Sequence, residues 1–258
     1  MTSRSFARAR LEECGFSVEE IPTAEREGLQ EADYMASYLG VTLLVEEKTK
    51  EEDPSRISDR QATHVRQQVH VETLVLASNK TVSGVIRDAA HQLSSSSRHP
   101  HDFRFLWFTA TGATAEGKYE QFMATLYGRK NIIELGVDGY RRCYFYRHSD
   151  FFKRRDVIDA AVAAYVKGSV VNARVCLNPL SPRYESLRKS PVLRPFGADV
   201  EDPLALEVKG TAFVLDADLN RRDEGPLLAY LQQKYTTGPL MATDLGYTRT
   251  SIGITRER

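Results

Sequence analysis

The order of elements in the sequence predicts an α/β protein. A β-branched and aliphatic run at 41–45 and an aromatic-rich run at 103–109, both typical of strands, alternate with helical segments. The clearest helical segment is 82–93, whose apolar residues recur every three or four positions. With 258 residues, the chain is long enough for one large domain or two small ones with a sizeable core.

The composition is that of an ordinary globular protein. Lysine plus arginine and aspartate plus glutamate each number 35, so the net charge is zero and does not by itself indicate a nucleic-acid partner. Three scattered cysteines, Cys14, Cys143 and Cys176, lack the spacing of a zinc or iron–sulfur site and favour a reducing compartment. No apolar run has the length of a membrane span and the N-terminus lacks the apolar core of a signal peptide, so we expect a cytoplasmic protein without a membrane partner.

The first fifty residues begin with a helix and end in a long strand. Gly15 is a typical helix C-cap, and Pro22 stops the alternating segment before it. The expected elements are a helix at 5–14, a short strand at 16–21, a polar loop at 23–31 and a segment at 34–39 that leads through Gly40 into a strand from 41.

The middle of the chain continues the alternation. Ser78 or Asn79 is available to cap the helix that follows, whereas 57–77 reads either as a helix or as a pair of strands. The further expected elements are strands at 103–109, 131–137 and 142–146, a helix at 119–127, and a helix opened by Ser149 with Val157, Ile158, Ala161, Val162 and Tyr165 facing inward.

After residue 168 the character of the sequence changes. The stretch 178–195 is rich in proline and cations and predicts a long arm or linker; a strand at 204–215, a helix at 226–235 and a strand within 238–255 follow. We therefore divide the chain into a first domain at 1–168 and an accessory α/β region at 169–258. The second region is either a separate subdomain or a return of the chain onto the first sheet, and the sequence does not decide between them.

The strand from Val41 ends abruptly in charged residues. Because side chains alternate along a strand, Glu46 and Lys48 point to one face and Glu47 to the other. Asp33, thirteen positions before Glu46, is a second carboxylate that the chain can bring beside the first. Two carboxylates are sufficient protein ligands for magnesium, and an ammonium group can orient a water molecule or stabilise negative charge on phosphate.

The helix at 5–14, the Gly-Phe-x-Val segment, Asp33 and the Leu-Val-Glu-Glu-Lys sequence that ends at Lys48 together resemble the PD-(D/E)xK nuclease superfamily over roughly residues 5 to 165. The resemblance implies a mixed central sheet flanked by helices, a restriction-endonuclease-like core, and hydrolysis of nucleic-acid phosphodiesters with a divalent metal. It assigns Asp33 and Glu46 as ligands of Mg²⁺ or Mn²⁺, the Glu47 carbonyl as a further ligand, and Lys48 as the residue that assists the attacking water.

The sequence departs from this family pattern at two points. Ala32 replaces the proline of the family name, and the glutamate that many members carry on the first helix has only Glu12 or Glu13 as counterparts. A second Glu-x-Lys, at Glu207 to Lys209, also ends an apolar run. We prefer the first match because a helix, a strand and an acidic residue precede it in the family's order.

The most basic local region lies at 141–155. Its cations are interleaved with aromatic residues, a combination that suits a nucleic-acid backbone, although surface cations beside buried aromatics explain the pattern nearly as well. The candidate DNA contacts are Arg141, Arg142, Lys153, Arg154 and Arg155.

The sequence thus predicts a metal-dependent nuclease, in the first instance an endonuclease acting on DNA in restriction, repair or phage defence. The alternative is a nuclease-like fold without catalytic activity that binds nucleic acid or a protein. A homodimer or a partner protein is compatible with both.

Overall fold

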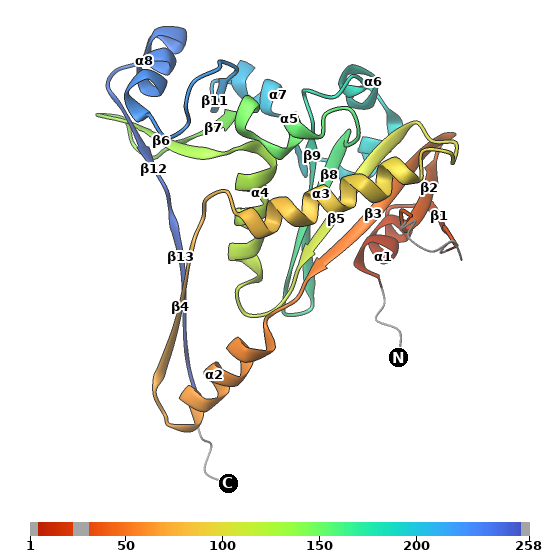
Figure 1. Ribbon diagram of the computed structural model, residues 1–258, viewed down its shortest axis with the longest axis horizontal. Coiled ribbons are helices and arrows are strands. Elements are labelled where there is room, and N and C mark those ends of the chain that lie inside the picture. The colour runs from red at the N-terminus through yellow and green to blue at the C-terminus, as the bar shows by residue number, and fades with distance from the viewer. Residues whose placement is uncertain (1–4, 23–30, 254–258) are drawn as a thin grey trace.

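The computed structural model describes residues 5–22 and 31–253, which form a large mixed sheet with helices on both faces, a smaller sheet and a projecting arm (Figure 1). The predicted α/β class is confirmed. The loop predicted at 23–31 falls, except for Glu31, outside the described residues.

The large sheet is built around the strand that carries the charged motif. Strands β1, β2 and β3 are antiparallel neighbours, β3, β5 and β8 run parallel, β9 is antiparallel to β8, and β10 is parallel to β9. The described strands are, in spatial order, β1 (Ser17–Glu20), β2 (Tyr34–Tyr38), β3 (Val41–Lys50), β5 (Phe103–Ala110), β8 (Ala160–Lys167), β9 (Val170–Leu177) and β10 (Val200–Glu201).

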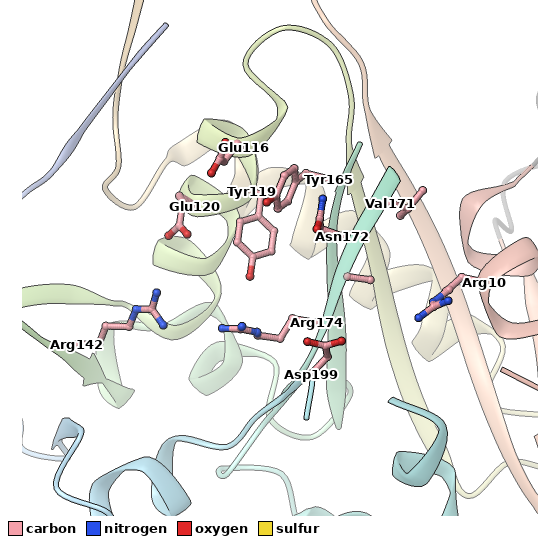
Figure 2. Close-up of a pocket in the computed structure, with 11 residues that line it drawn as sticks. Arg10, Glu116, Tyr119, Glu120, Arg142, Tyr165, Val171, Asn172, Arg174 and Asp199 are labelled. Carbon is pink, nitrogen blue, oxygen red and sulfur yellow. The ribbon is translucent and has the colours of Figure 1, made fainter. Parts of the chain in front are cut away.

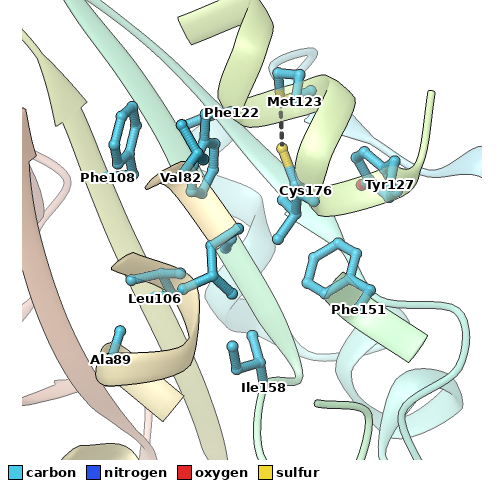
Figure 3. Close-up of a cluster of buried hydrophobic side chains, with 14 of the residues drawn as sticks. Val82, Ala89, Leu106, Phe108, Phe122, Met123, Tyr127, Phe151, Ile158 and Cys176 are labelled. Carbon is cyan, nitrogen blue, oxygen red and sulfur yellow. Dashed lines mark hydrogen bonds between the residues drawn. The ribbon is translucent and has the colours of Figure 1, made fainter. Parts of the chain in front are cut away.

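Helices α3 (Lys80–Ser95) and α4 (Ala115–Tyr127) cover one face of this sheet. Of the two predicted caps, Asn79 begins α3, and its side chain accepts hydrogen bonds from the backbone amides of Thr81 and Val82. The apolar residues of both helices pack on the alternate sheet residues whose side chains point to this face, including Leu106 and Cys176. Together these side chains form the larger core (Figure 3).

The opposite face is covered by three short helical elements. They pack on the sheet residues whose side chains point to that face, such as Val45 and Trp107. They are α1 (Phe6–Glu13), α6 (Tyr184–Arg188) and the 3-10 helix η2 (Pro191–Phe196). The predicted first helix and its end before Gly15 are confirmed.

A smaller sheet lies beside the large one and packs against α8 (Glu224–Tyr235). The strands at 131–137 and 142–146 and the helix at 226–235 were expected from the sequence, with slightly different limits. The strands are, in spatial order, β11 (Ala212–Leu215), β7 (Arg141–Phe145), β6 (Lys130–Glu134) and β12 (Leu240–Thr243).

The arm extends away from the two sheets (Figure 1). It consists of α2 (Pro54–Val65) and a two-stranded antiparallel ribbon of β4 (Val69–Val75) and β13 (Gly246–Ile252), so 57–77 is a helix followed by one strand. At its base, Leu74 and Tyr247 lie so close to Gly117 of α4 that a Cβ atom there would approach them to 2.8 and 2.9 Å. A larger residue at this position would require the Leu74 and Tyr247 side chains to shift where the arm meets the body.

The helix predicted after Ser149 is wrong beyond its first turn. Ser149 caps a short helix, α5 (Asp150–Lys153), but the rest of the segment is β8. Ala161 and Ala163 of β8 belong to the core beneath α3 and α4, whereas Val162 belongs to the opposite core. A strand buried on both faces is a continuous apolar run, which periodicity does not distinguish from a buried helix.

The linker predicted at 178–195 is also wrong, because this segment forms α6 and η2. Tyr184, Leu187, Val192 and Phe196 are buried and anchor it to the sheet. The strand predicted at 204–215 is correct only for β11; its first half is α7 (Pro203–Val208), which Asp202 caps through its carboxylate. The second Glu-x-Lys consequently lies at the end of a helix.

After residue 168 the chain contributes strands to all three sheets. Strands β9 and β10 extend the large sheet, β11 and β12 complete the smaller one, and β13 pairs with β4. The chain therefore places residues from both halves of the sequence on the same face of the large sheet.

Candidate active site

Strand β3 directs its charged residues to the two faces of the large sheet, as the alternation predicts. Glu47 points toward α1, where its carboxylate accepts hydrogen bonds from the backbone amides of Phe6 and Ala7, both at 3.0 Å, and from the Ser5 hydroxyl. The Glu47 side chain thus caps the first turn of α1, where negative charge is stabilising. Only its backbone carbonyl remains available for the ligand role expected from the sequence.

Asp33 is fixed beside β3 at the start of β2. Its backbone amide donates to the Val45 carbonyl at 3.0 Å, and its Oδ2 accepts a hydrogen bond of 2.7 Å from the Glu47 amide. The structure therefore brings Asp33 to the strand that carries Glu46, as the sequence indicated.

Glu46 is fully buried beneath α3 and α4. Burial raises the pKa of its carboxyl group to about 8, and the charge of Asp33 contributes in the same direction, while Lys48 partly opposes both. The raised pKa shows that the single ammonium of Lys48 does not outweigh burial and the neighbouring carboxylate. A buried carboxylate beside a second carboxylate is costly to ionise, so this group is poised to gain from a cation.

Lys48 completes the group from the same face of β3. Its Nζ lies 2.6 Å from Glu46 Oε1 and donates to Gln92 Oε1 at 2.5 Å. Gln92 in turn donates through Nε2 to the Glu31 carbonyl at 3.4 Å. The sequence offered five polar residues on α3, Lys80, Arg87, Asp88, His91 and Gln92, and could not identify Gln92 as the one that holds the lysine.

The residues present fit a hard divalent cation. Asp33 and Glu46 provide two carboxylates, and magnesium commonly uses one or two together with water and substrate oxygens. In the described part of the chain, no group of three or more His, Cys, Asp or Glu side chains is arranged to hold a metal ion. Glu12 and Glu13 do not join the group, because they pair with Arg8 and Arg10 on α1, over the other face.

The five basic residues of the predicted DNA-binding region do not share one partner. Arg141 pairs with Glu134 and lies over the Phe213 ring, whereas Arg142 points to the opposite face of β7. Lys153 pairs with Asp150, and Arg155 donates to the Phe152 carbonyl. Arg154 is partly buried, with no hydrogen-bond partner for its Nε among the described residues.

Sequence analysis missed a second charged cluster on the same face of the large sheet. Glu201 of β10 is buried, accepts a hydrogen bond of 2.8 Å from the Tyr144 hydroxyl, and is surrounded by three guanidinium groups. Their closest distances to its carboxylate are 3.6 Å for Arg129, 3.9 Å for Arg142 and 3.1 Å for Arg174. Burial raises the pKa of Glu201, but these positive charges outweigh it and hold the pKa below its ordinary value.

No protein-family model matches the chain, and comparisons with curated proteins and with solved structures give no significant match. None of the described helices is long and apolar enough to cross a membrane.

Proposed function

We propose that the protein is a divalent-metal-dependent nuclease that hydrolyses phosphodiester bonds in DNA, with Asp33, Glu46 and Lys48 as its catalytic residues. The observation that carries the proposal is Glu46, a fully buried carboxylate whose pKa is raised to about 8, placed next to the second carboxylate Asp33 and 2.6 Å from the ammonium of Lys48. Strongly perturbed carboxylates of this kind concentrate at functional sites.

Each residue has a defined task in this proposal. Asp33 and Glu46, with the Glu47 carbonyl, would hold Mg²⁺ or Mn²⁺, which lowers the pKa of a bound water and stabilises charge on the phosphate. Because burial raises its pKa to about 8, Glu46 releases a proton when it becomes a ligand. Lys48, held by Gln92, stabilises the negative charge that develops on the phosphate when water attacks and the P–O ester bond breaks.

Substrate would approach from the side of Asp33 and Lys48. Asp33 is only partly buried and the Lys48 side chain is 28% exposed, whereas Glu46 is fully buried behind them. DNA as the substrate rests on the resemblance to PD-(D/E)xK nucleases and on the proposed contacts of the basic residues at 141–155.

The first test is cleavage of supercoiled, linear and single-stranded DNA with magnesium, manganese or chelator. We expect metal-dependent cutting that falls by about 100-fold or more in Lys48→Ala, because one group that stabilises the transition state is typically worth that much. Asp33→Asn should lose its dependence on metal together with its activity.

Lys50→Ala is the matched control, because Lys50 follows Lys48 on the same face of β3 and is exposed. It removes the same charge from the same strand and should cut within a few-fold of the original protein. Cutting by Asp33→Asn at the original rate would refute the site. An unfolded Lys48→Ala variant would instead assign Lys48 to the stability of the fold.

A second function, binding without catalysis, is favoured by one observation: Lys48 already lies close enough to Glu46 to offset its charge without a metal. Calorimetric titration with manganese separates the two functions. Binding that is lost in Asp33→Asn supports the enzyme, whereas no binding to the original protein supports the module that only binds nucleic acid or a protein.

A further inference from the structure

A cavity of about 340 Å³ lies along β9, between α4, β7 and β8 on the side of the large sheet that carries Glu46, and reaches Arg10 of α1 on the other side (Figure 2). Arg174 in this cavity occupies the same row of the sheet as Lys48, through Ala163 and Phe108. Three strand spacings separate them, which is roughly 14 Å. The cavity is therefore distinct from the candidate active site.

Two guanidinium groups face each other across this cavity, that of Arg142 from β7 and that of Arg174 from β9 (Figure 2). Beneath them, Glu201 contacts both and also Arg129, and Arg129 pairs in addition with Glu120. This cluster thus contains three guanidinium charges against two carboxylate charges. The wider lining adds Arg10, Glu116 and Asp199, so the two guanidinium groups are a local concentration of positive charge in a cavity of mixed charge.

The cavity also contains hydrogen-bond donors that the protein itself does not use. Among the described residues, Arg142 makes no hydrogen bond, and its contact with Glu201 is 3.9 Å long. The Tyr119 hydroxyl likewise has no partner there and points toward the two guanidinium groups (Figure 2). Burial raises the pKa of Tyr119, so this hydroxyl keeps its proton at neutral pH and remains a donor.

Arg174 is held in place more firmly than Arg142. Its guanidinium donates to Glu201 at 3.1 Å, and Glu201 is itself fixed by the Tyr144 hydroxyl. A planar guanidinium with free N–H groups matches an oxyanion with two acceptor oxygens, and a site that is already ordered loses little entropy on binding.

The remaining walls limit the kind of anion that fits. Glu116, Glu120 and Asp199 also line the cavity, so a polyanion would meet like charges around the guanidinium pair. A ligand with one oxyanion and with hydroxyl or amino groups close to it can satisfy both the arginines and these carboxylates. Beside them, the rings of Tyr119 and Tyr165 lie 5.2 Å apart and provide an apolar wall.

We propose that Arg142, Arg174 and Tyr119 form a binding site for a small phosphate monoester, of the class of sugar phosphates and nucleoside monophosphates. The volume is at the low end of small-molecule sites, as expected for a ligand of this size. The site shares no residue with Asp33, Glu46 and Lys48, so it does not depend on the proposed catalysis, although Arg142 is also one of the proposed DNA contacts.

Isothermal titration calorimetry and thermal unfolding with four probes test this site: inorganic phosphate, ribose 5-phosphate, adenosine 5′-monophosphate and adenosine. We expect the phosphate-bearing probes to bind with dissociation constants of about 10 µM to 1 mM and to raise the unfolding temperature. Inorganic phosphate binding as tightly as the larger esters would mean that the oxyanion alone is recognised, and weaker binding would mean that the sugar or base contributes; both support the site.

Two variants assign the contacts. Arg142→Gln should weaken binding about tenfold or more, because it removes the guanidinium that has no hydrogen bond of its own. Tyr119→Phe should weaken it by about threefold to tenfold without loss of stability, since the hydroxyl has no partner to lose. Arg141→Gln is the matched control, because Arg141 is the neighbouring residue on β7 and lies over Phe213 instead.

The proposal is overturned if no phosphate-bearing probe binds below about 10 mM, or if adenosine binds as tightly as its monophosphate. Unchanged affinity in Arg142→Gln, or the same loss in Arg141→Gln, would also overturn it. Because Tyr119→Phe removes only one unpartnered hydroxyl, its affinity can be measured even if an arginine variant fails to fold.

Discussion

Two buried glutamates lie at opposite ends of one row of the large sheet, and their surroundings differ in almost every respect. The row runs from Glu46 through Leu106, Ala161 and Cys176 to Glu201, all on the face covered by α3 and α4. Four strand spacings separate the two carboxylates at the backbone, roughly 19 Å. Glu46 is 0% exposed and Glu201 is 3% exposed, so burial does not distinguish them.

The partners of the two carboxylates do distinguish them. Glu201 has three arginines and a tyrosine hydroxyl around it, whereas Glu46 has one lysine and a second carboxylate, Asp33. The pKa of Glu201 is consequently lowered, while that of Glu46 is raised to about 8. The same residue type at the same depth thus serves as an ionised anchor at one end and as a largely protonated group at the other.

This difference separates a structural from a chemical use of a buried carboxylate. At Glu201 the cost of burial is offset within the protein, and the cluster ties β7, β9 and β10 together. At Glu46 the cost is offset only in part, by Lys48, so ionisation of this group reduces stability unless a further cation binds there.

Neutralising each glutamate in turn should have the largest effect and the clearest contrast. Glu201→Gln leaves Arg129, which is buried, and two further guanidinium groups without their central carboxylate. We expect it to lower the free energy of unfolding by roughly 4 kcal/mol, the usual result of breaking a buried ion pair. Glu46→Gln should instead raise it at pH 7, by up to roughly 2 kcal/mol, because the folded protein holds a proton on Glu46 that the unfolded chain has released, and glutamine has no such cost.

Urea denaturation of both variants in the presence of chelator measures these changes. Equal losses in Glu201→Gln and Glu46→Gln would show that the two carboxylates contribute alike. A gain in stability on removal of Glu201 would mean that its desolvation outweighs the attraction of the arginines.

The stability of the protein should depend on pH mainly through Glu46. Between the ordinary carboxyl pKa and about 8, the folded protein holds a proton on Glu46 that the unfolded chain has released. The free energy of unfolding therefore falls as the pH rises through this window, and the full stability is present below it. One proton can change the free energy of unfolding by at most about 1.4 kcal/mol per pH unit. Because the interior relaxes around a buried charge, we expect this free energy to fall by roughly 2 kcal/mol in total across the window.

The measurement is denaturant unfolding from pH 5 to pH 9 in chelator, compared with Glu46→Gln. The variant should lack most of this slope, because it has no proton to release at that position. If the slope persists in Glu46→Gln, another group is responsible and the raised pKa of Glu46 is not the cause.

The sequence was sufficient to predict the Glu46 end of the row and not the Glu201 end. Strand alternation placed Glu46 and Lys48 on one face because three charged residues follow a single buried run. The role of Gln92 on α3 could not be inferred, since nine polar residues share that helix and only packing selects one.

The Glu201 cluster is assembled from segments that are far apart in the chain. Arg129 precedes β6, Arg142 lies on β7 and Arg174 on β9, and β10 itself has only two residues. Arg141 and Arg142 were grouped by sequence as one basic region, yet alternation along β7 sends them to opposite faces. The alternation of β7 is enough to predict that separation. The return of β9 and β10 to the large sheet is not predictable in the same way, because β9 pairs with β8, and the sequence of β8 predicts a helix.

A third glutamate, Glu47, provides an intermediate case and the smallest of these effects. Its carboxylate is partly buried and is satisfied by the backbone amides of Phe6 and Ala7 instead of by cations. We expect Glu47→Ala to lower the free energy of unfolding by about 1 kcal/mol, the usual value of a helix N-cap. Glu47→Gln keeps an acceptor oxygen and should recover part of this loss.

The same pair of variants separates the side chain of Glu47 from its carbonyl. If only the carbonyl serves the proposed metal site, Glu47→Gln should cleave DNA within a few-fold of the original protein, because the backbone of β3 is unchanged. Loss of cleavage in Glu47→Gln with stability retained would mean that the carboxylate takes part in the chemistry. The side chains of Glu46, Glu47 and Lys48 would then all take part in catalysis. The assignment of the Glu47 side chain to α1 on one face, and of Glu46 and Lys48 to the active site on the other, would be wrong.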